Sequence, residues 1–284
     1  MRLRPRIAWV LCLAGGLVAC DDNTASGEGV EAVGVVRTIE PAELAEVADH
    51  VLDSRSTDAF ASGHVEGACP ISAAALRAAV DGVDGQVAPR EDAWQAFAAA
   101  GLHPDDTVVV TADDNGTDPA RIAWTLRYYG HRGDVVLLDG GMRAYAEQGL
   151  PVASGTGPAP GAYEAGETRE ELRVDKAWML AHLDDASVQV FDVRSAGEYA
   201  AGHIPGARNV DWSTNKNADG SFRSSTDVRA LHGEPEASTL VVYCQTGSRA
   251  AVSWALLQRA GYEDVRLYDG SWSEWSADPD TPRE

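Results

Sequence analysis

The chain has 284 residues, with 44 acidic side chains against 23 basic ones and a formal net charge of -21. Such a surface repels phosphate backbones, so nucleic acid is not expected as a partner. The length suits two domains of medium size, because single domains commonly hold roughly 100 to 200 residues.

The first 19 residues are predicted to form a secretory signal peptide. Three arginines precede an apolar run at residues 7–19, which is shorter than the about 20 residues that a spanning helix needs. The sequence LVAC at residues 17–20 resembles the bacterial lipoprotein box, in which the cysteine is lipidated and becomes the new N-terminus. We expect a lipid anchor at Cys20, although an ordinary signal peptide is the alternative.

This anchor implies export to the bacterial cell envelope, on the periplasmic or extracytoplasmic face of the membrane. Residues 20–36 contain many small and acidic side chains and are predicted to be a flexible tether.

Two parts of the remaining chain repeat each other. Residues 51–68 (VLDSRSTDAFASGHVEGA) align without a gap with residues 190–207 (VFDVRSAGEYAAGHIPGA). Residues 130–145 align with residues 261–275, where both copies contain the pair Asp-Gly. Such self-similarity indicates two copies of one structural unit.

Each copy alternates short apolar runs with longer amphipathic ones. In the first copy, strands are predicted at residues 51–52, 108–110 and 135–138, and helices at residues 41–48, 93–100 and 119–129. This alternation is typical of βαβ units. We therefore expect an α/β fold with two domains, each a parallel sheet flanked by helices on both faces. Their predicted bounds are residues 37–150 and 171–284, joined by a Pro- and Gly-rich linker at residues 151–170.

Cys244 follows a predicted strand at residues 240–243 and precedes a helix predicted for residues 249–257. Loops at the carboxyl ends of parallel strands carry functional groups, and the N-terminus of a helix favours an anion. Cys244 is therefore interpreted as a nucleophilic thiolate, with a buried structural cysteine as the alternative. Gly247 suits a tight turn with positive φ, and Arg249 adds a cation. The predicted substrate-binding residues are Gln245, Thr246, Gly247, Ser248 and Arg249.

The first copy has Ala112 at the position of Cys244, followed by Asp113, Asp114 and Asp118. A loop without a nucleophile and with three carboxylates would repel an anionic substrate. The first domain is therefore predicted to be catalytically inactive and to pack against the second as a wall of the active-site cleft.

Asp192 and Arg194 recur in the first copy as Asp53 and Arg55. Because the copy without a nucleophile also has them, they are interpreted as a structural ion pair. Neither Cys-x-x-Cys nor His-x-x-x-His spacing occurs, so no metal site is expected. Cys69 is interpreted as a packed thiol, and a Cys69–Cys244 disulfide stays open.

Four residues separate Cys244 from Arg249, whereas the corresponding loop of Cys-dependent phosphatases has five. The chain resembles the tandem-domain rhodaneses, sulfurtransferases of the thiosulfate and 3-mercaptopyruvate type. The resemblance is carried by FDVRSAGEYAAGHIPGARNVDW from residue 191, YCQTGSRA from residue 243 and GYEDVRLYDGSWSEW from residue 261. It implies a rhodanese-like fold in both halves and a nucleophile only in the second.

The resemblance also implies a cycle in which Cys244 takes the outer sulfur of thiosulfate as a persulfide. Cyanide or another thiophilic acceptor then removes the sulfur, without a cofactor or a metal. The expected partners are thus a small anionic sulfur donor and a thiophilic acceptor, and the protein is expected to be a monomer.

Two positions depart from the pattern of the family's thiosulfate enzymes, which carry cations where this chain has Thr246 and Glu198. The loop CQTGSR also differs from the loop of the mercaptopyruvate type. A 3-mercaptopyruvate sulfurtransferase and a non-catalytic carrier of persulfide sulfur are therefore kept as alternatives to a thiosulfate sulfurtransferase.

Overall fold

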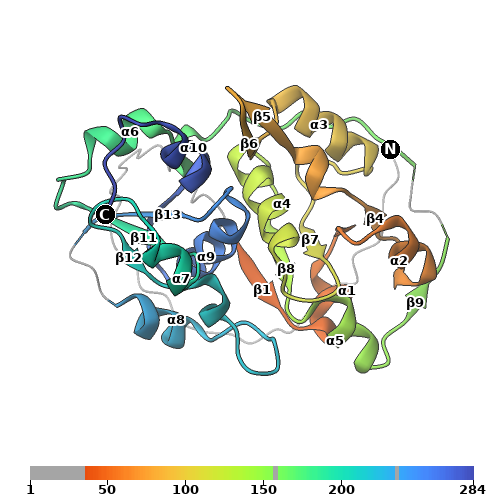
Figure 1. The fold of residues 1–284 in the computed structure, drawn as a ribbon. Coiled ribbons are helices and arrows are strands. Elements are labelled where there is room, and N and C mark those ends of the chain that lie inside the picture. Colours follow the sequence, from red (N-terminus) through yellow and green to blue (C-terminus); the bar gives the residue numbers. More distant parts are fainter. Residues whose placement is uncertain (1–35, 156–158, 234–236) are drawn as a thin grey trace, which may run out of the picture. The chain divides into compact units, whose positions relative to one another are not determined.

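The computed structural model of the chain describes residues 36–155, 159–233 and 237–284 (Figure 1). The predicted signal peptide, the predicted lipidation at Cys20 and all but the last residue of the predicted tether lie outside these residues. No helix in the described part of the chain is long and apolar enough to cross a membrane.

The first half contains a parallel sheet with the strand order β1-β8-β7-β2-β4. Its strands are β1 (Arg37–Ile39), β2 (His50–Asp53), β4 (Cys69–Pro70), β7 (Val108–Thr111) and β8 (Val135–Leu138). Its helices are η1 (Pro41–Glu43), α1 (Leu44–Val47), α2 (Thr57–Ser62), η2 (Ala73–Leu76), α3 (Arg90–Ala99), α4 (Thr117–Tyr128) and α5 (Gly141–Glu147). Two antiparallel pairs accompany the sheet: β3 (His64–Val65) with β9 (Val152–Ala153), and the hairpin of β5 (Arg77–Val80) and β6 (Val83–Val87).

The second half repeats the arrangement with the strand order β10-β14-β13-β11-β12, again parallel. Its strands are β10 (Arg173–Val174), β11 (Val188–Asp192), β12 (Arg208–Asn209), β13 (Thr239–Tyr243) and β14 (Asp264–Tyr268). Its helices are η3 (Glu170–Leu172), α6 (Lys176–Ala181), α7 (Ala196–Ala200), η4 (Trp212–Asn215), α8 (Ser225–His232), α9 (Ser248–Arg259) and α10 (Ser271–Ala277). The predicted fold of two similar α/β units with parallel sheets is confirmed.

Strand β7 shows why these sheets need helices on both faces. Val108 and Val110 point into a core cluster that contains Phe97 of α3, whereas Val109 points into a second cluster with Phe60 of α2 and Met142 of α5. Because successive side chains of a strand point to opposite faces, a strand buried on both sides must be apolar throughout.

The two halves share their largest core. Helices α4 and α9 pack against each other, as Figure 1 shows, and Trp124 of α4 and Trp254 of α9 are completely buried in one cluster. All described residues belong to one compact unit.

The segment predicted as a linker packs along the first half. Tyr163 is buried, and its hydroxyl lies 2.9 Å from His131 Nδ1. The N–H group of Gly161 donates to Ala98 O at 2.8 Å. These contacts attach the described part of the segment to α3 and to the end of α4.

Candidate active site

Cys244 lies directly after β13, on a loop that leads into α9. Every residue of β13 is buried, and the Cys244 side chain is itself only 1% exposed. Gly247 stands at the N-cap of α9 with φ of 84°, so the expected positive φ is confirmed. A left-handed residue lets the chain pass from strand to helix in four residues, and glycine takes that conformation with little strain.

The start of α10 holds the backbone of this loop. The Cys244 N–H group donates to Ser271 Oγ at 3.2 Å, and the Trp272 N–H group donates to Cys244 O at 3.0 Å. The Ser273 N–H group donates to Gln245 O at 3.0 Å, and the Gln245 amide donates to Ser273 Oγ. The carbonyl oxygens of Cys244 and Gln245 therefore face α10 rather than the N-terminus of α9.

Ser271 takes an unusual conformation to make this contact. It has φ of 52° although it is not glycine, and it is completely buried. Such backbone costs of order 1–3 kcal/mol and persists only where the surroundings hold it, as they often do at functional sites. Here the Ser271 hydroxyl also donates to Tyr268 O at 2.9 Å.

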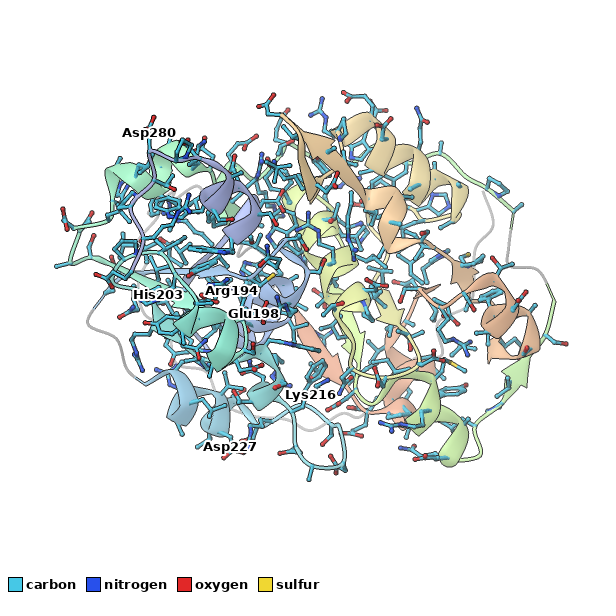
Figure 2. All side chains as sticks on the ribbon, viewed as in Figure 1. Arg194, Glu198, His203, Lys216, Asp227 and Asp280 are labelled. Atoms are coloured by element: carbon cyan, nitrogen blue, oxygen red, sulfur yellow. The ribbon has the colours of Figure 1, made fainter. Side chains whose placement is uncertain are left out.

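Arg249 lies in the first turn of α9 and pairs with Glu198 of α7, which Figure 2 labels. Its two Nη atoms each donate to a Glu198 carboxylate oxygen at 2.8 Å, and Cys244 is a second neighbour that raises its pKa. A capping box with Ser195 orients the carboxylate. Hydrogen bonds from Arg249 are the main cause that lowers the pKa of Glu198 to about 2, and the same pairing raises the pKa of Arg249.

Asp192 and Arg194 form a buried ion pair, with Arg194 Nη2 at 2.5 Å from Asp192 Oδ2. Arg194 also donates to Gly202 O at 2.8 Å, which closes the loop after α7. The first half repeats this arrangement with Arg55, Asp53 and Gly63. Since the half without a nucleophile makes the same contacts, the pair stabilises a loop and does not depend on Cys244.

The loop of the first half has the same frame without a thiol. The Met142 N–H group donates to Ala112 O at 2.8 Å, as Trp272 does to Cys244 in the second half. Asp113 and Asp114 are exposed, and Asp118 pairs with Arg77 at 2.6 Å.

Cys69 and Cys244 are both free thiols, so no disulfide joins them. Cys69 is buried in the core on β4, and burial raises its pKa to about 11.

The sequence did not predict that Ser271, Asp269 and Arg121 lie at this site. Asp269 is completely buried beside the loop and accepts a hydrogen bond at 2.6 Å from Arg121 of the first half. The repeated Asp-Gly pair was the available signal for Asp269 and for the turn that follows it. Arg121 gave no signal, because it lies in the half that has no nucleophile.

Two comparisons place these features among known proteins. Residues 40–148 and 175–278 each match the rhodanese-like domain. The solved structure of SseA from Escherichia coli, described as a 3-mercaptopyruvate sulfotransferase with the rhodanese fold, superposes with a TM-score of 0.73 at 25% identity. The match covers 84% of this chain and 99% of SseA.

The chain is also similar to three relatives with different names. The thiosulfate sulfurtransferase of Azotobacter vinelandii is 30% identical over 82% of this chain and 90% of its own length. The sulfur carrier protein TtuD of Thermus thermophilus is 36% identical, and the match covers 62% of this chain and 70% of TtuD. The probable 3-mercaptopyruvate sulfurtransferase of Pseudomonas aeruginosa is 35% identical, and the match covers 65% of this chain and 69% of that protein.

Proposed function

Because the chain belongs to the rhodanese-like domain family and carries two copies of that domain, we propose that it is a sulfurtransferase that transfers sulfur from thiosulfate to a thiophilic acceptor. The observation that carries this proposal is the position of Cys244 between β13 and α9, with the Arg249 guanidinium beside its thiol. The first four N–H groups of a helix have no partner within it, so the start of α9 favours an anion at this place.

The proposed reaction has two steps. The Cys244 thiolate attacks the outer sulfur of thiosulfate, the S–S bond of thiosulfate breaks, and sulfite leaves with the bonding electron pair. An acceptor such as cyanide then attacks the outer sulfur of the Cys244 persulfide and forms thiocyanate, and the thiolate is restored. In each step one bond to the transferred sulfur forms and one breaks, so no further oxidant or reductant is needed.

Several groups can stabilise the persulfide anion. Ser248 Oγ is buried at the start of α9 and has no hydrogen-bond partner within the described residues. Together with Arg249 and the N–H groups of the first turn, it offers donors to a negative sulfur, as an oxyanion hole does to oxygen.

The proposal is tested by incubating the protein with thiosulfate and cyanide and measuring thiocyanate. In the Cys244→Ser variant the rate should fall at least about a thousandfold, because the reacting sulfur has no other acceptor. Cys69→Ala is the control and should keep the activity, since Cys69 lies in the core of the first half. Activity that persists in Cys244→Ser would show that another group reacts.

The same protein samples distinguish two alternative functions, a sulfur carrier and a 3-mercaptopyruvate sulfurtransferase. The similarity to a sulfur carrier protein supports a carrier as the second candidate. A gain of one sulfur atom in the intact mass, without repeated turnover, would favour the carrier. A higher kcat/KM with 3-mercaptopyruvate than with thiosulfate would instead identify 3-mercaptopyruvate as the donor.

We further propose that the protein is exported and attached to the cell envelope by lipidation of Cys20, which the lipoprotein box at residues 17–20 supports. The Cys20→Ala variant should then leave the membrane fraction. A variant that stays in that fraction would contradict lipidation at this residue.

A further inference from the structure

Asp269 connects the first half of the chain to the active loop of the second. It follows β14 directly, and its side chain is completely buried. Arg121 Nη1 of α4 donates to Asp269 Oδ1 at 2.6 Å, and the Val87 N–H group of β6 donates to Oδ2 at 2.7 Å. Both donors belong to the half without a nucleophile, so that half binds a carboxylate of the catalytic half.

The bound carboxylate lies next to the residues that hold Cys244. Gly270 and Ser271 follow Asp269 in the chain, and Ser271 Oγ accepts the Cys244 N–H group. A shift of Asp269 would therefore move the acceptor of that N–H group.

The same ion pair also lies against the turn of the active loop. A Cβ atom added to Gly247 would be 2.8 Å from Arg121 Nη1 and 3.1 Å from Asp269 Oδ1. A Cβ added to Gly85, on β6, would be 2.8 Å from Thr246 Cβ. These approaches place the Arg121 guanidinium and the β5–β6 hairpin against the loop.

In the corresponding contact of the other half, no arginine forms an ion pair with the aspartate among the described residues, although Arg259 of the second half interacts with its charge. Asp139, the repeat counterpart of Asp269, accepts the Phe222 N–H group of the opposite half at 3.0 Å. Its second donor is the amide of Asn115, at 2.5 Å, which belongs to its own half. An arginine supplied by the opposite half thus occurs at the aspartate that adjoins the cysteine loop.

We propose that Arg121 is a positioning residue for Cys244, and that the catalytically silent half thereby completes the sulfur-accepting site. Arg121 fixes the Asp269 carboxylate and neutralises it. The loop then keeps its shape, and the Cys244 thiolate does not face an uncompensated negative charge. This inference rests on the proposed function only in taking Cys244 as the reacting group.

The charges that face Cys244 make the effect of Arg121 testable. Arg249, which pairs with Glu198, acts on the thiol, and the Arg121–Asp269 pair lies against Gly247 of the same loop. Arg173 Nε lies 3.6 Å from Asp269 Oδ2 and is a second cation at that carboxylate. A nearby negative charge disfavours a thiolate and a nearby positive charge favours it. Removing the Arg121 cation should therefore disfavour the Cys244 thiolate. Removing the Asp269 carboxylate should favour it.

The experiment measures the rate at which iodoacetamide alkylates Cys244 as a function of pH, with the peptide identified by mass spectrometry. Arg121→Met should move the midpoint of this profile up by about one pH unit, since Asp269 then lacks its main cation. Asp269→Asn should move the midpoint down, since Arg121 then lacks its anion. Arg121→Lys should return the midpoint toward the wild-type value.

Two matched variants control for loss of stability. Arg127 is a second buried arginine of α4, but it donates to Gly133 O at 2.9 Å within the first half. Asp139→Asn alters the counterpart contact of the interface. Both Arg127→Met and Asp139→Asn should keep the wild-type midpoint.

Equal midpoints in Arg121→Met and wild type, or equal shifts in Arg121→Met and Arg127→Met, would overturn the inference. If Arg121→Met does not fold, the downward shift in Asp269→Asn decides, and its absence counts against the inference. Alkylation reads the thiol itself, so a wild-type protein without sulfurtransferase activity would contradict the proposed function but not this result.

Discussion

Glu198 occupies the position at which the family's thiosulfate enzymes were expected to carry a cation, and it binds Arg249 instead. The two 2.8 Å hydrogen bonds fix the guanidinium and offset the charge that it presents to Cys244. The N-terminus of α9 also favours an anion, and it has no paired carboxylate within the described residues. An anionic sulfur donor would therefore be stabilised less by Arg249 alone than by the loop and the start of α9 together.

This pair predicts a pH-dependent contribution to stability. The pKa of Glu198 is lowered from its ordinary value of 4.5 to about 2, so its pairing stabilises the fold above pH 4.5 and is lost as the pH falls toward 2. Compared with wild type, Glu198→Gln should have a lower free energy of unfolding near neutral pH. The difference should shrink through this window and be absent at its acidic end.

Urea unfolding at about pH 7, 5 and 3 measures this difference. It should be small, because the Glu198 side chain is 36% exposed and solvent screens the pair. A difference that is as large at about pH 3 as at neutral pH would contradict the assignment.

At the scale of elements, the strand β13, the loop and helix α9 form a unit that the first half repeats with β7 and α4. The two loops share their anchoring by the following helix, through Trp272 in one half and Met142 in the other. They differ in what the turn contacts, because Gly247 lies against the Arg121–Asp269 pair. A β-carbon is thus excluded at Gly247 by space as well as by φ.

Two glycines with positive φ separate these effects. Gly247→Ala and Gly206→Ala both place alanine at left-handed φ, 84° and 74°, which costs about 1 kcal/mol each. Only the new Cβ at Gly247 meets other atoms, whereas none lies within 4 Å of that at Gly206. Gly247→Ala should therefore lose roughly 1–3 kcal/mol more in urea unfolding and most of the thiocyanate-forming activity.

In the same assay Gly206→Ala should keep the activity of the wild type. Equal losses of stability and activity in the two variants would show that the contact with Arg121 does not matter.

At the scale of the whole molecule, the two halves are held together by a common core around α4 and α9. Ile122 of α4 and Val252 of α9 are both completely buried in that cluster. Each helix therefore covers its own sheet on one side and the partner helix on the other. This packing gives the first half a structural role that does not depend on a nucleophile.

A substitution in this core should lower the stability of both halves together. Ile122→Ala removes buried methyl groups and should reduce the free energy of unfolding by about 2–5 kcal/mol. Tryptophan fluorescence and far-UV circular dichroism should report one coincident urea transition, at a lower midpoint than wild type. Two separate transitions, with one half unchanged, would show that the halves unfold independently.

The sequence by itself determined the two α/β units, the strands and helices around Cys244 and the absence of a nucleophile in the first half. These features depend on local apolar patterns, on the glycine at the turn and on a repeat, all of which neighbouring residues encode. The tertiary structure decided that Glu198 neutralises Arg249 and that Arg121 reaches Asp269, 148 residues away in the chain. The Glu198–Arg249 pair forms because the second half places α7 beside the start of α9. The Arg121–Asp269 pair forms because the burial of α4 against α9 brings the two halves together. No local sequence pattern records either arrangement.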